Sequence, residues 1–140
     1  MEYPLIAAGF AGILIILQQI LMITTGFQRV SSSIGVGVGE DDVLLRKTRR
    51  HGNLAENSAI LIFLVTFIEL SGAPYNVVVG FAVLFLISRI AHAIGLSYNS
   101  GAVARNFTGA TLCRVIGAFT TGFGGLAGAG YLLFRVYGMM

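Results

Sequence analysis

The chain has 140 residues, of which 56% are apolar and only 11% are charged, against about 45–50% and about 25% in an ordinary soluble domain. So few charges exclude a soluble domain, and they exclude a disordered chain because disordered segments are polar and rich in charge. The single cysteine, Cys113, excludes an intramolecular disulfide and a cysteine-based zinc site. The net charge of +3 rests on basic residues too few and too separated to bind nucleic acid. The composition indicates one small integral membrane domain over residues 1–140.

Four apolar segments are long enough to cross a bilayer, whose core of about 30 Å needs roughly 20 residues of helix. They predict an all-α integral membrane four-helix bundle, with helices over residues 4–27, 43–71, 75–97 and 103–136. Lipid cannot satisfy exposed backbone groups, and the alternation typical of a barrel is absent. The first segment is too long for a removable signal peptide and has no basic region before it.

The basic residues predict the orientation of the bundle. Five of them lie in residues 28–51, including Lys47 and Arg50, and Arg105 and Arg114 lie near the third connection. The connection 71–75 has none. By the positive-inside rule, the first and third connections face the cytosol and both termini lie on the opposite side. Lys47 and Arg50 are interpreted as anchors at the membrane surface.

Four polar residues at the start of the second helix form a stripe. Arg46, Arg49, Asn53 and Glu56 are spaced by three, four and three, which places them on one helix face. An amide and an acid just below the membrane surface are costly without partners, so Asn53 and Glu56 are candidates for a functional site. The alternative is structural, with the two arginines as surface anchors and Arg49 paired with Glu56.

The third helix adds Arg89 and His92, one turn apart and at the predicted level of Glu56. A buried pair between Arg89 and Glu56 remains open as a structural alternative. His92 has no cysteine or carboxylate at ligand spacing, so no metal site is expected. Arg29 at the end of the first helix and Arg105 complete a ring, so that all four helices deliver polar groups to one cytosolic mouth.

The chemistry of this mouth suits a small zwitterion that carries more negative than positive charge. Arginines bind carboxylates in two-point contacts, and Glu56 can hold an ammonium group. An arginine can also lower the pKa of a thiol and so favour the reactive thiolate. Apolar helix faces beside the mouth would admit a lipophilic second substrate from the bilayer.

Several runs in the sequence resemble one family, the membrane-associated proteins in eicosanoid and glutathione metabolism (MAPEG). The run RKTRRHGNLAE, residues 46–56, resembles the family signature RxxRxxxNxxE, and RIAHAIG, residues 89–95, resembles the RxxH segment of its prostaglandin E synthase branch. The spacing from His92 to Arg105 matches the place of an arginine near the glutathione sulfur in that branch. TGFQR, ending at Arg29, resembles the end of the first helix, and GVGVGEDDVLLR is similar to bacterial members.

The resemblance implies a homotrimer in a bacterial inner membrane, with a glutathione site between each pair of adjacent subunits. It implies a membrane glutathione transferase or peroxidase of the microsomal glutathione transferase and prostaglandin E synthase type, with a role in detoxification. Glutathione would react with a lipophilic small molecule or a lipid hydroperoxide drawn from the bilayer, and Arg105 would stabilise its thiolate. The residues that would line the glutathione site are Arg29, Arg46, Arg49, Asn53, Glu56, Arg89 and His92.

Two other functions are open at this point. One is a non-catalytic lipid-binding or scaffold protein of the same fold, and the other is a small transporter that uses Glu56 as a proton or cation site. The chain departs from the family pattern at Asn57 and Leu96, where many members carry a tyrosine, and at Asn106, where the family has a serine.

The last helix contains two small-xxx-small pairs, Gly124 with Gly128 and Ala118 with Gly122. Such spacing lets two helix backbones approach closely in lipid. The pairs are expected either to pack inside one subunit or to form an interface between subunits.

Overall fold

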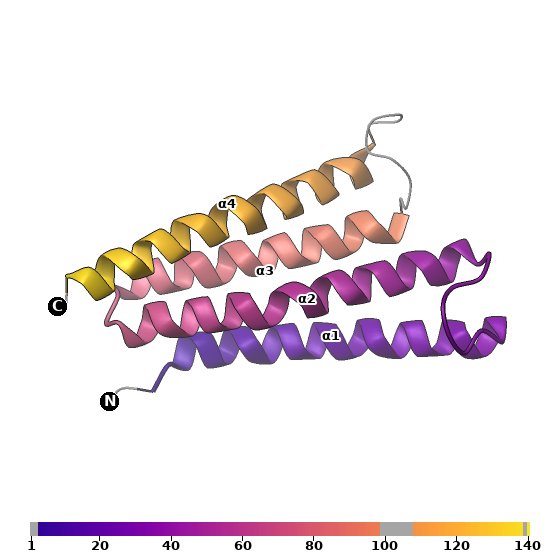
Figure 1. Cartoon of the computed structure of the whole chain (residues 1–140), viewed down its shortest axis with the longest axis horizontal. Coiled ribbons are helices and arrows are strands. Elements are labelled where there is room, and N and C mark those ends of the chain that lie inside the picture. The colour runs from indigo at the N-terminus through magenta and orange to yellow at the C-terminus, as the bar shows by residue number, and fades with distance from the viewer. Residues whose placement is uncertain (1–2, 99–107, 139) are drawn as a thin grey trace.

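The computed structural model describes residues 3–98, 108–138 and 140, which form four helices running alternately up and down (Figure 1). The helices are α1 (Leu5–Ser32), α2 (Asp42–Leu70), α3 (Tyr75–Tyr98) and α4 (Gly109–Tyr137). Each is long and apolar enough to cross a membrane. The prediction of an all-α integral membrane four-helix bundle is confirmed.

One helix ends several residues later than predicted, and the predicted start of another lies outside the described residues. The first helix continues to Ser32, five residues past the predicted end at residue 27, and stops where Ser33 adopts a left-handed conformation with φ 57°. The prediction ended it where apolar residues end, but a helix can continue past the apolar region because its backbone bonds do not depend on lipid. The predicted start of the last helix, at residue 103, lies outside the described residues.

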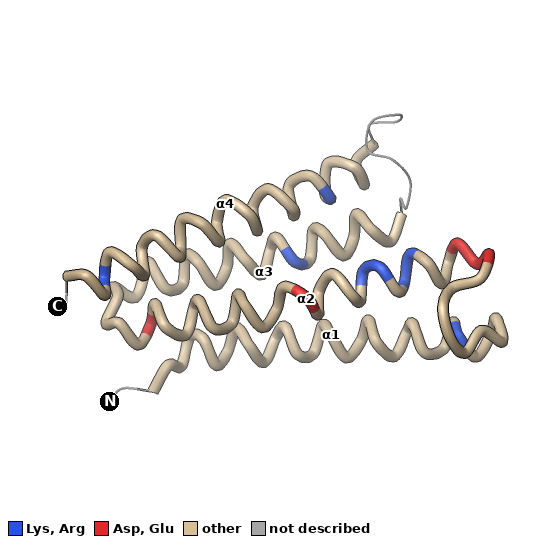
Figure 2. Tube along the Cα trace, in the orientation of Figure 1, with Lys and Arg blue, Asp and Glu red and all other residues tan. Residues whose placement is uncertain are grey.

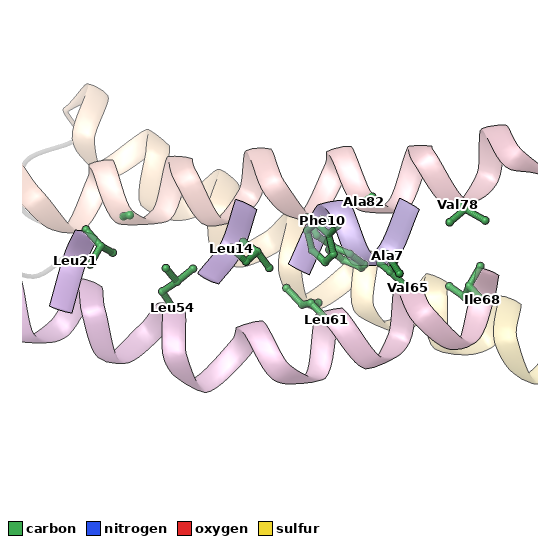
Figure 3. Close-up of a cluster of buried hydrophobic side chains, with 12 residues drawn as sticks. Ala7, Phe10, Leu14, Leu21, Leu54, Leu61, Val65, Ile68, Val78 and Ala82 are labelled. Atoms are coloured by element: carbon green, nitrogen blue, oxygen red, sulfur yellow. The ribbon is translucent and has the colours of Figure 1, made fainter. Parts of the chain in front are cut away.

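Large apolar side chains from α1, α2 and α3 form the core (Figure 3). On α1, Phe10, Leu14 and Leu21 recur at helical spacing and are buried. They pack in one cluster with residues of α2 and α3 such as Val65 and Phe85. The opposite faces carry exposed apolar side chains, as expected of helices surrounded by lipid. The chain is therefore an integral multi-pass membrane protein.

The fourth helix packs through small residues. Its buried residues are Thr111, Gly117, Gly124 and Gly128. Its main partner is α3, it also touches α2, and no contact with α1 occurs between their described residues. The Gly124 and Gly128 pair therefore packs inside the subunit, whereas Gly122, with nothing within 4 Å of its Cβ position, faces outward with Ala118.

Most basic residues gather toward one end of the bundle (Figure 2). We call this the basic end: it is where α1 and α3 end and where α2 and α4 begin. At this end Asp41 caps α2, because one of its carboxylate oxygens accepts from the backbone N–H groups of Val43 and Leu44 at 2.8 and 3.0 Å. The cap therefore determines where α2, with its polar stripe, begins.

Candidate functional site

Two adjoining cavities lie toward the basic end of the bundle. The larger, of about 400 Å³, is within the size range of small-molecule sites, about 300–1,000 Å³. The smaller, of about 180 Å³, shares three of its lining residues with the larger. The larger is lined by Thr48, Arg49, Gly52, Asn53, Glu56, His92, Leu96 and Arg114, and the smaller by Leu45, Arg46, Arg49, Leu96 and Arg114.

The predicted polar stripe of α2 lines these cavities. Asn53 and Glu56 line the larger, Arg46 lines the smaller, and Arg49 lines both. Their spacing of three and four residues turns them toward the same side of the helix. The structure therefore brings all four together, and it adds His92 from α3.

Arg89 lies behind the larger cavity rather than in its wall. Its side chain is only 2% exposed. Its Nη1 donates to the amide oxygen of Asn53 at 3.0 Å, and its Nη2 donates to the backbone oxygen of Gly117 at 3.2 Å and to the hydroxyl of Thr121. Arg89 thus pairs with Asn53 and not with Glu56, the alternative raised from the sequence. This bond leaves the amide N–H₂ of Asn53 as the group that can donate to a ligand.

The hydroxyl of Ser88 completes the network behind Asn53. It bonds to the backbone oxygen of Gly117 at 2.7 Å and to the hydroxyl of Thr121 at 2.6 Å. The network therefore joins α2, α3 and α4 through a buried guanidinium. Polar networks of this kind hold their members in one geometry when their hydrogen bonds are satisfied.

Of the other predicted site residues, Arg29 contacts the connection after α1 instead of the cavities. Arg29 donates to backbone oxygens of the connection that follows α1, at 3.4 Å to Ile34 and Gly35 and at 2.7 Å to Gly37. It orders that connection and lines neither cavity. Arg105 lies outside the described residues.

Two basic residues interpreted as surface anchors also contact neighbouring helices. Arg50 donates to the hydroxyl of Ser97 at 2.9 Å and to that of Thr24 at 3.0 Å, which joins α2 to both α3 and α1. Lys47 donates to Gln28 at 2.9 Å. The sequence could not indicate these bonds because it does not reveal which helices are neighbours on that side.

The sequence interpretation also missed Arg114 and Thr48 as lining residues. The sequence pattern marks Arg114 only as a charge that helps to orient the bundle. The glycine-rich α4 has few large apolar residues to mark its buried face, so nothing in its pattern indicated where Arg114 would lie.

Two side chains in the wall of the larger cavity carry polar atoms without partners. Thr48 Oγ1 and His92 Nδ1 are both buried, and neither has a hydrogen-bond partner among the residues described. Buried polar atoms are usually paired, so these two point to a polar ligand nearby. Across 3–98 and 108–138, no group of three histidine, cysteine, aspartate or glutamate side chains is placed to hold a metal ion.

Comparison with known proteins assigns the family. The sequence model described as "MAPEG family" matches residues 7–133, which include both cavities. The chain belongs to the MAPEG family. No curated protein and no solved structure gives a significant match to it. The MAPEG family includes glutathione transferases and related enzymes, and its members generally use glutathione. In this MAPEG protein, the cavity-lining stripe and the buried network therefore become candidates for glutathione recognition.

Proposed function

We propose that this MAPEG protein is a membrane-bound glutathione transferase or peroxidase that acts on lipophilic electrophiles. The observation that carries the proposal is the larger cavity. It combines Arg49 and Glu56 with Asn53, whose amide is held from behind by the buried Arg89. Cations, one acid and one amide in a single pocket match a small peptide with two carboxylates and one ammonium group.

Binding follows from charge complementarity. The arginines of the cavities can each take a carboxylate in a two-point contact. Glu56 can pair with the ammonium group, and the amide N–H₂ of Asn53 can donate to a peptide or carboxylate oxygen. The remaining candidates, Arg46 and His92, line the same pair of cavities. Arg29 is proposed to act on the site from a neighbouring subunit or through the connection that it orders.

Catalysis requires the thiolate of glutathione. A positive group near the sulfur lowers the thiol pKa, and we assign this role to Arg105. In conjugation the thiolate forms a bond to an electrophilic carbon, and the leaving group departs with the electron pair. In peroxide reduction it attacks the outer oxygen of the hydroperoxide, the O–O bond breaks, and the released alkoxide takes up a proton from solvent to give the alcohol. The thiol of a second glutathione then converts the sulfenic acid to disulfide and water. Holding both substrates together supplies much of the rate.

The assembly and orientation complete the proposal. The outer face of α4 carries an apolar groove of about 310 Å³ lined by Ala118, Phe119, Gly122, Phe123 and Leu126. Such small residues would let a helix of another subunit approach closely, which favours an assembly with sites between subunits. We propose that this assembly is the homotrimer that the family resemblance implies. The basic end would face the cytosol of a bacterium, across the inner membrane, with both termini on the opposite side. The mass of the detergent-solubilised assembly tests the trimer.

A thiol assay tests the function. Purified protein in detergent should consume glutathione in the presence of an aryl halide, and glutathione should raise the melting temperature. Arg105→Ala should lower the rate at least about 10-fold while glutathione still stabilises the protein. Lys47→Gln, which removes one charge outside both cavities, should leave the rate unchanged. Full activity of Arg105→Ala would contradict the role of Arg105. Stabilisation by anionic lipid but not by glutathione would favour the lipid-binding alternative.

A further inference from the structure

One cation of α2 lies away from both cavities, between α1 and α3. Arg50 lines neither cavity. Its Nη1 donates to the hydroxyl of Ser97 on α3 at 2.9 Å, and its Nη2 donates to the hydroxyl of Thr24 on α1 at 3.0 Å. Among the residues that the structure describes, these two hydroxyls are its hydrogen-bond partners and no carboxylate is one of them. Within the described chain, the charge of Arg50 therefore meets neutral groups.

The two hydroxyls hold the guanidinium in place and leave it with unused donors. The hydroxyl of Thr24 donates its own proton to the backbone oxygen of Leu21 at 3.0 Å. The hydroxyl of Ser97 donates its proton to the backbone oxygen of Ala93 at 2.8 Å. Each hydroxyl thus serves Arg50 as an acceptor. A guanidinium has two N–H groups on each terminal nitrogen, so the bonds within the described residues leave one on each for a further acceptor. Arg50 is half-buried, which leaves it open to a ligand from outside the bundle.

The neighbouring cation of α2 is compensated in a way that Arg50 is not. Lys47 lies one turn earlier, and its Nζ donates to the amide oxygen of Gln28 at 2.9 Å. The amide nitrogen of Gln28 in turn donates to the carboxylate of Asp41 at 2.9 Å. The charge of Lys47 is thereby linked to an acid through one amide. A cation near membrane depth is costly without an anion, so of these two residues Arg50 is the one that calls for an external anion.

The level of Arg50 is that of phospholipid head groups. Residues 46–51 are mostly basic, and apolar residues predominate after Leu54, four residues or about 6 Å farther along α2. Head groups occupy such a boundary, outside a hydrocarbon core of about 30 Å. Arginine binds phosphate in two-point contacts, and basic positions between transmembrane helices bind anionic head groups. The anion that this position favours is therefore a lipid phosphate.

An apolar cavity lies farther along the same two helices. It has a volume of about 130 Å³, and its lining comes from α1 and α3 alone, with Ile13 and Leu86 nearest to the basic end. Thr24 lies 11 residues from Ile13, which is about 16 Å along α1. Ser97 lies 11 residues from Leu86, again about 16 Å. One leaflet of the hydrocarbon core is about 15 Å deep, so an acyl chain that starts at the level of Arg50 ends at this cavity.

We propose that Arg50, held by Thr24 and Ser97, binds the phosphate of an anionic phospholipid in the leaflet at the basic end. The phosphate accepts from the unused N–H groups of Arg50, and an acyl chain follows the seam between α1 and α3 to the cavity at Ile13 and Leu86. This lipid site is separate from the two cavities assigned to glutathione, and it does not depend on the proposed function. A lipid that contacts both α1 and α3 stabilises the folded bundle, because it binds the folded chain and not the unfolded one.

Thermal unfolding in detergent with added lipid tests the site. Phosphatidylglycerol should raise the melting temperature of the wild type more than phosphatidylcholine does, because the head group of phosphatidylcholine carries its own cation. Inorganic phosphate should have no effect, because it has no chain to fill the seam. Arg50→Gln should raise the phosphatidylglycerol concentration that gives half of the maximal stabilisation about 10-fold, the usual scale for loss of a hydrogen bond to a charged group. It should leave stabilisation by glutathione unchanged.

Three further variants separate lipid binding from folding and from general charge. Arg49→Gln is the matched control, because Arg49 is the adjacent arginine but lines both cavities. It should keep the response to phosphatidylglycerol and weaken the response to glutathione. Lys47→Gln removes the charge that is linked to Asp41 and should keep both responses. Arg50→Lys keeps the charge without the planar fork and should give an intermediate response to phosphatidylglycerol, even if Arg50→Gln folds poorly. A melting temperature without lipid reports the folding of each variant.

The outcomes distinguish this inference from the proposed function. Equal dependence on phosphatidylglycerol in wild type, Arg50→Lys and Arg50→Gln overturns the role of Arg50. A response lost in Arg49→Gln but kept in Arg50→Gln also overturns it, because the lipid would then lie in the cavities. Equal stabilisation by inorganic phosphate overturns the lipid as the source of the anion. Failure of the wild type to bind glutathione overturns the proposed function and leaves this inference standing.

Discussion

The two ends of the bundle carry charged side chains that are used in different ways. At the end opposite the basic end, Glu69 of α2 accepts from the first backbone N–H groups of α1, at 3.0 Å from Ile6 and 2.7 Å from Ala7. Arg135 of α4 donates to the backbone oxygens of Ser71 and Gly72, at 2.6 and 3.0 Å, just after α2 ends. Both charges satisfy backbone groups that a helix end leaves unpaired.

At the basic end Arg29 and Asp41 also bond to backbone groups, but other charges line cavities. Glu56, on the same helix as Glu69, lies in the wall of the larger cavity with Arg49. A charge within an apolar segment is therefore not by itself a sign of a ligand site, although it is always costly to bury. What distinguishes a site charge from a structural one is whether it faces unpaired backbone groups near a helix end or a space that a ligand can enter.

The largest effect that tests this comparison comes from the two glutamates of α2. Glu69→Ala leaves two backbone donors of α1 unpaired, so we expect it to lower the free energy of unfolding in detergent by about 2 kcal/mol. Glu56→Ala removes an exposed carboxylate and should change stability by less than about 0.5 kcal/mol, but it should weaken glutathione binding about 10-fold. Thermal unfolding with and without glutathione measures both. A loss of stability in Glu56→Ala, with a loss of glutathione binding in Glu69→Ala, would contradict the assignment of Glu69 to structure and of Glu56 to the site.

A smaller effect is expected from the glycines of α4. A Cβ at Gly117 would lie 2.9 Å from backbone atoms of His92 and Ser88, which cannot move without moving α3. A Cβ at Gly128 would meet the end of the Leu64 side chain at 2.9 Å, which can rotate away.

We therefore expect Gly117→Ala to destabilise the protein by about 1–3 kcal/mol, and Gly128→Ala by clearly less. Gly130→Ala, with nothing within 4 Å of its Cβ position and outside the apolar groove of α4, is the matched control and should be neutral or slightly stabilising, since alanine favours the helix. Melting temperatures of the three variants decide. An equal loss of melting temperature for Gly117→Ala and Gly128→Ala would contradict this expectation. It would show that α4 packs no more rigidly against α3 at Gly117 than against the Leu64 side chain at Gly128.

The smallest effect concerns the cap of α2 at the basic end. The backbone N–H of Leu44 and the side-chain amide of Gln28 stabilise the charged form of Asp41, so the pKa of its carboxyl is lowered from 3.8. A lowered pKa in the folded state adds stability above the ordinary value, and this stability is lost as the pH falls through the folded value.

The difference in melting temperature between wild type and Asp41→Ala should thus be constant from pH 7 to pH 5. It should shrink below about pH 4, the ordinary pKa of an aspartate. Asp42→Ala serves as the control because Asp42 is exposed and lies outside the cap. A difference that grows toward acid pH would contradict the assigned sign.

Much of the architecture was readable from the residues alone. A helix that crosses lipid appears in the sequence as a long apolar segment, because its side chains face hydrocarbon and its backbone groups bond within the helix. All four helices were therefore predictable. The stripe of Arg46, Arg49, Asn53 and Glu56 was also predictable, because helical periodicity places residues on a common face before any packing occurs.

Only the tertiary structure decided which polar groups meet. The pairing of Arg89 with Asn53, the bridge from Arg50 to Thr24 and Ser97, and the place of Arg114 each depend on how one helix is rotated against another. In α4 that rotation is determined by glycines that come within contact of α3 and α2. A glycine has no side chain to mark a buried face in the sequence, so its role becomes visible only when the neighbouring helix is in place.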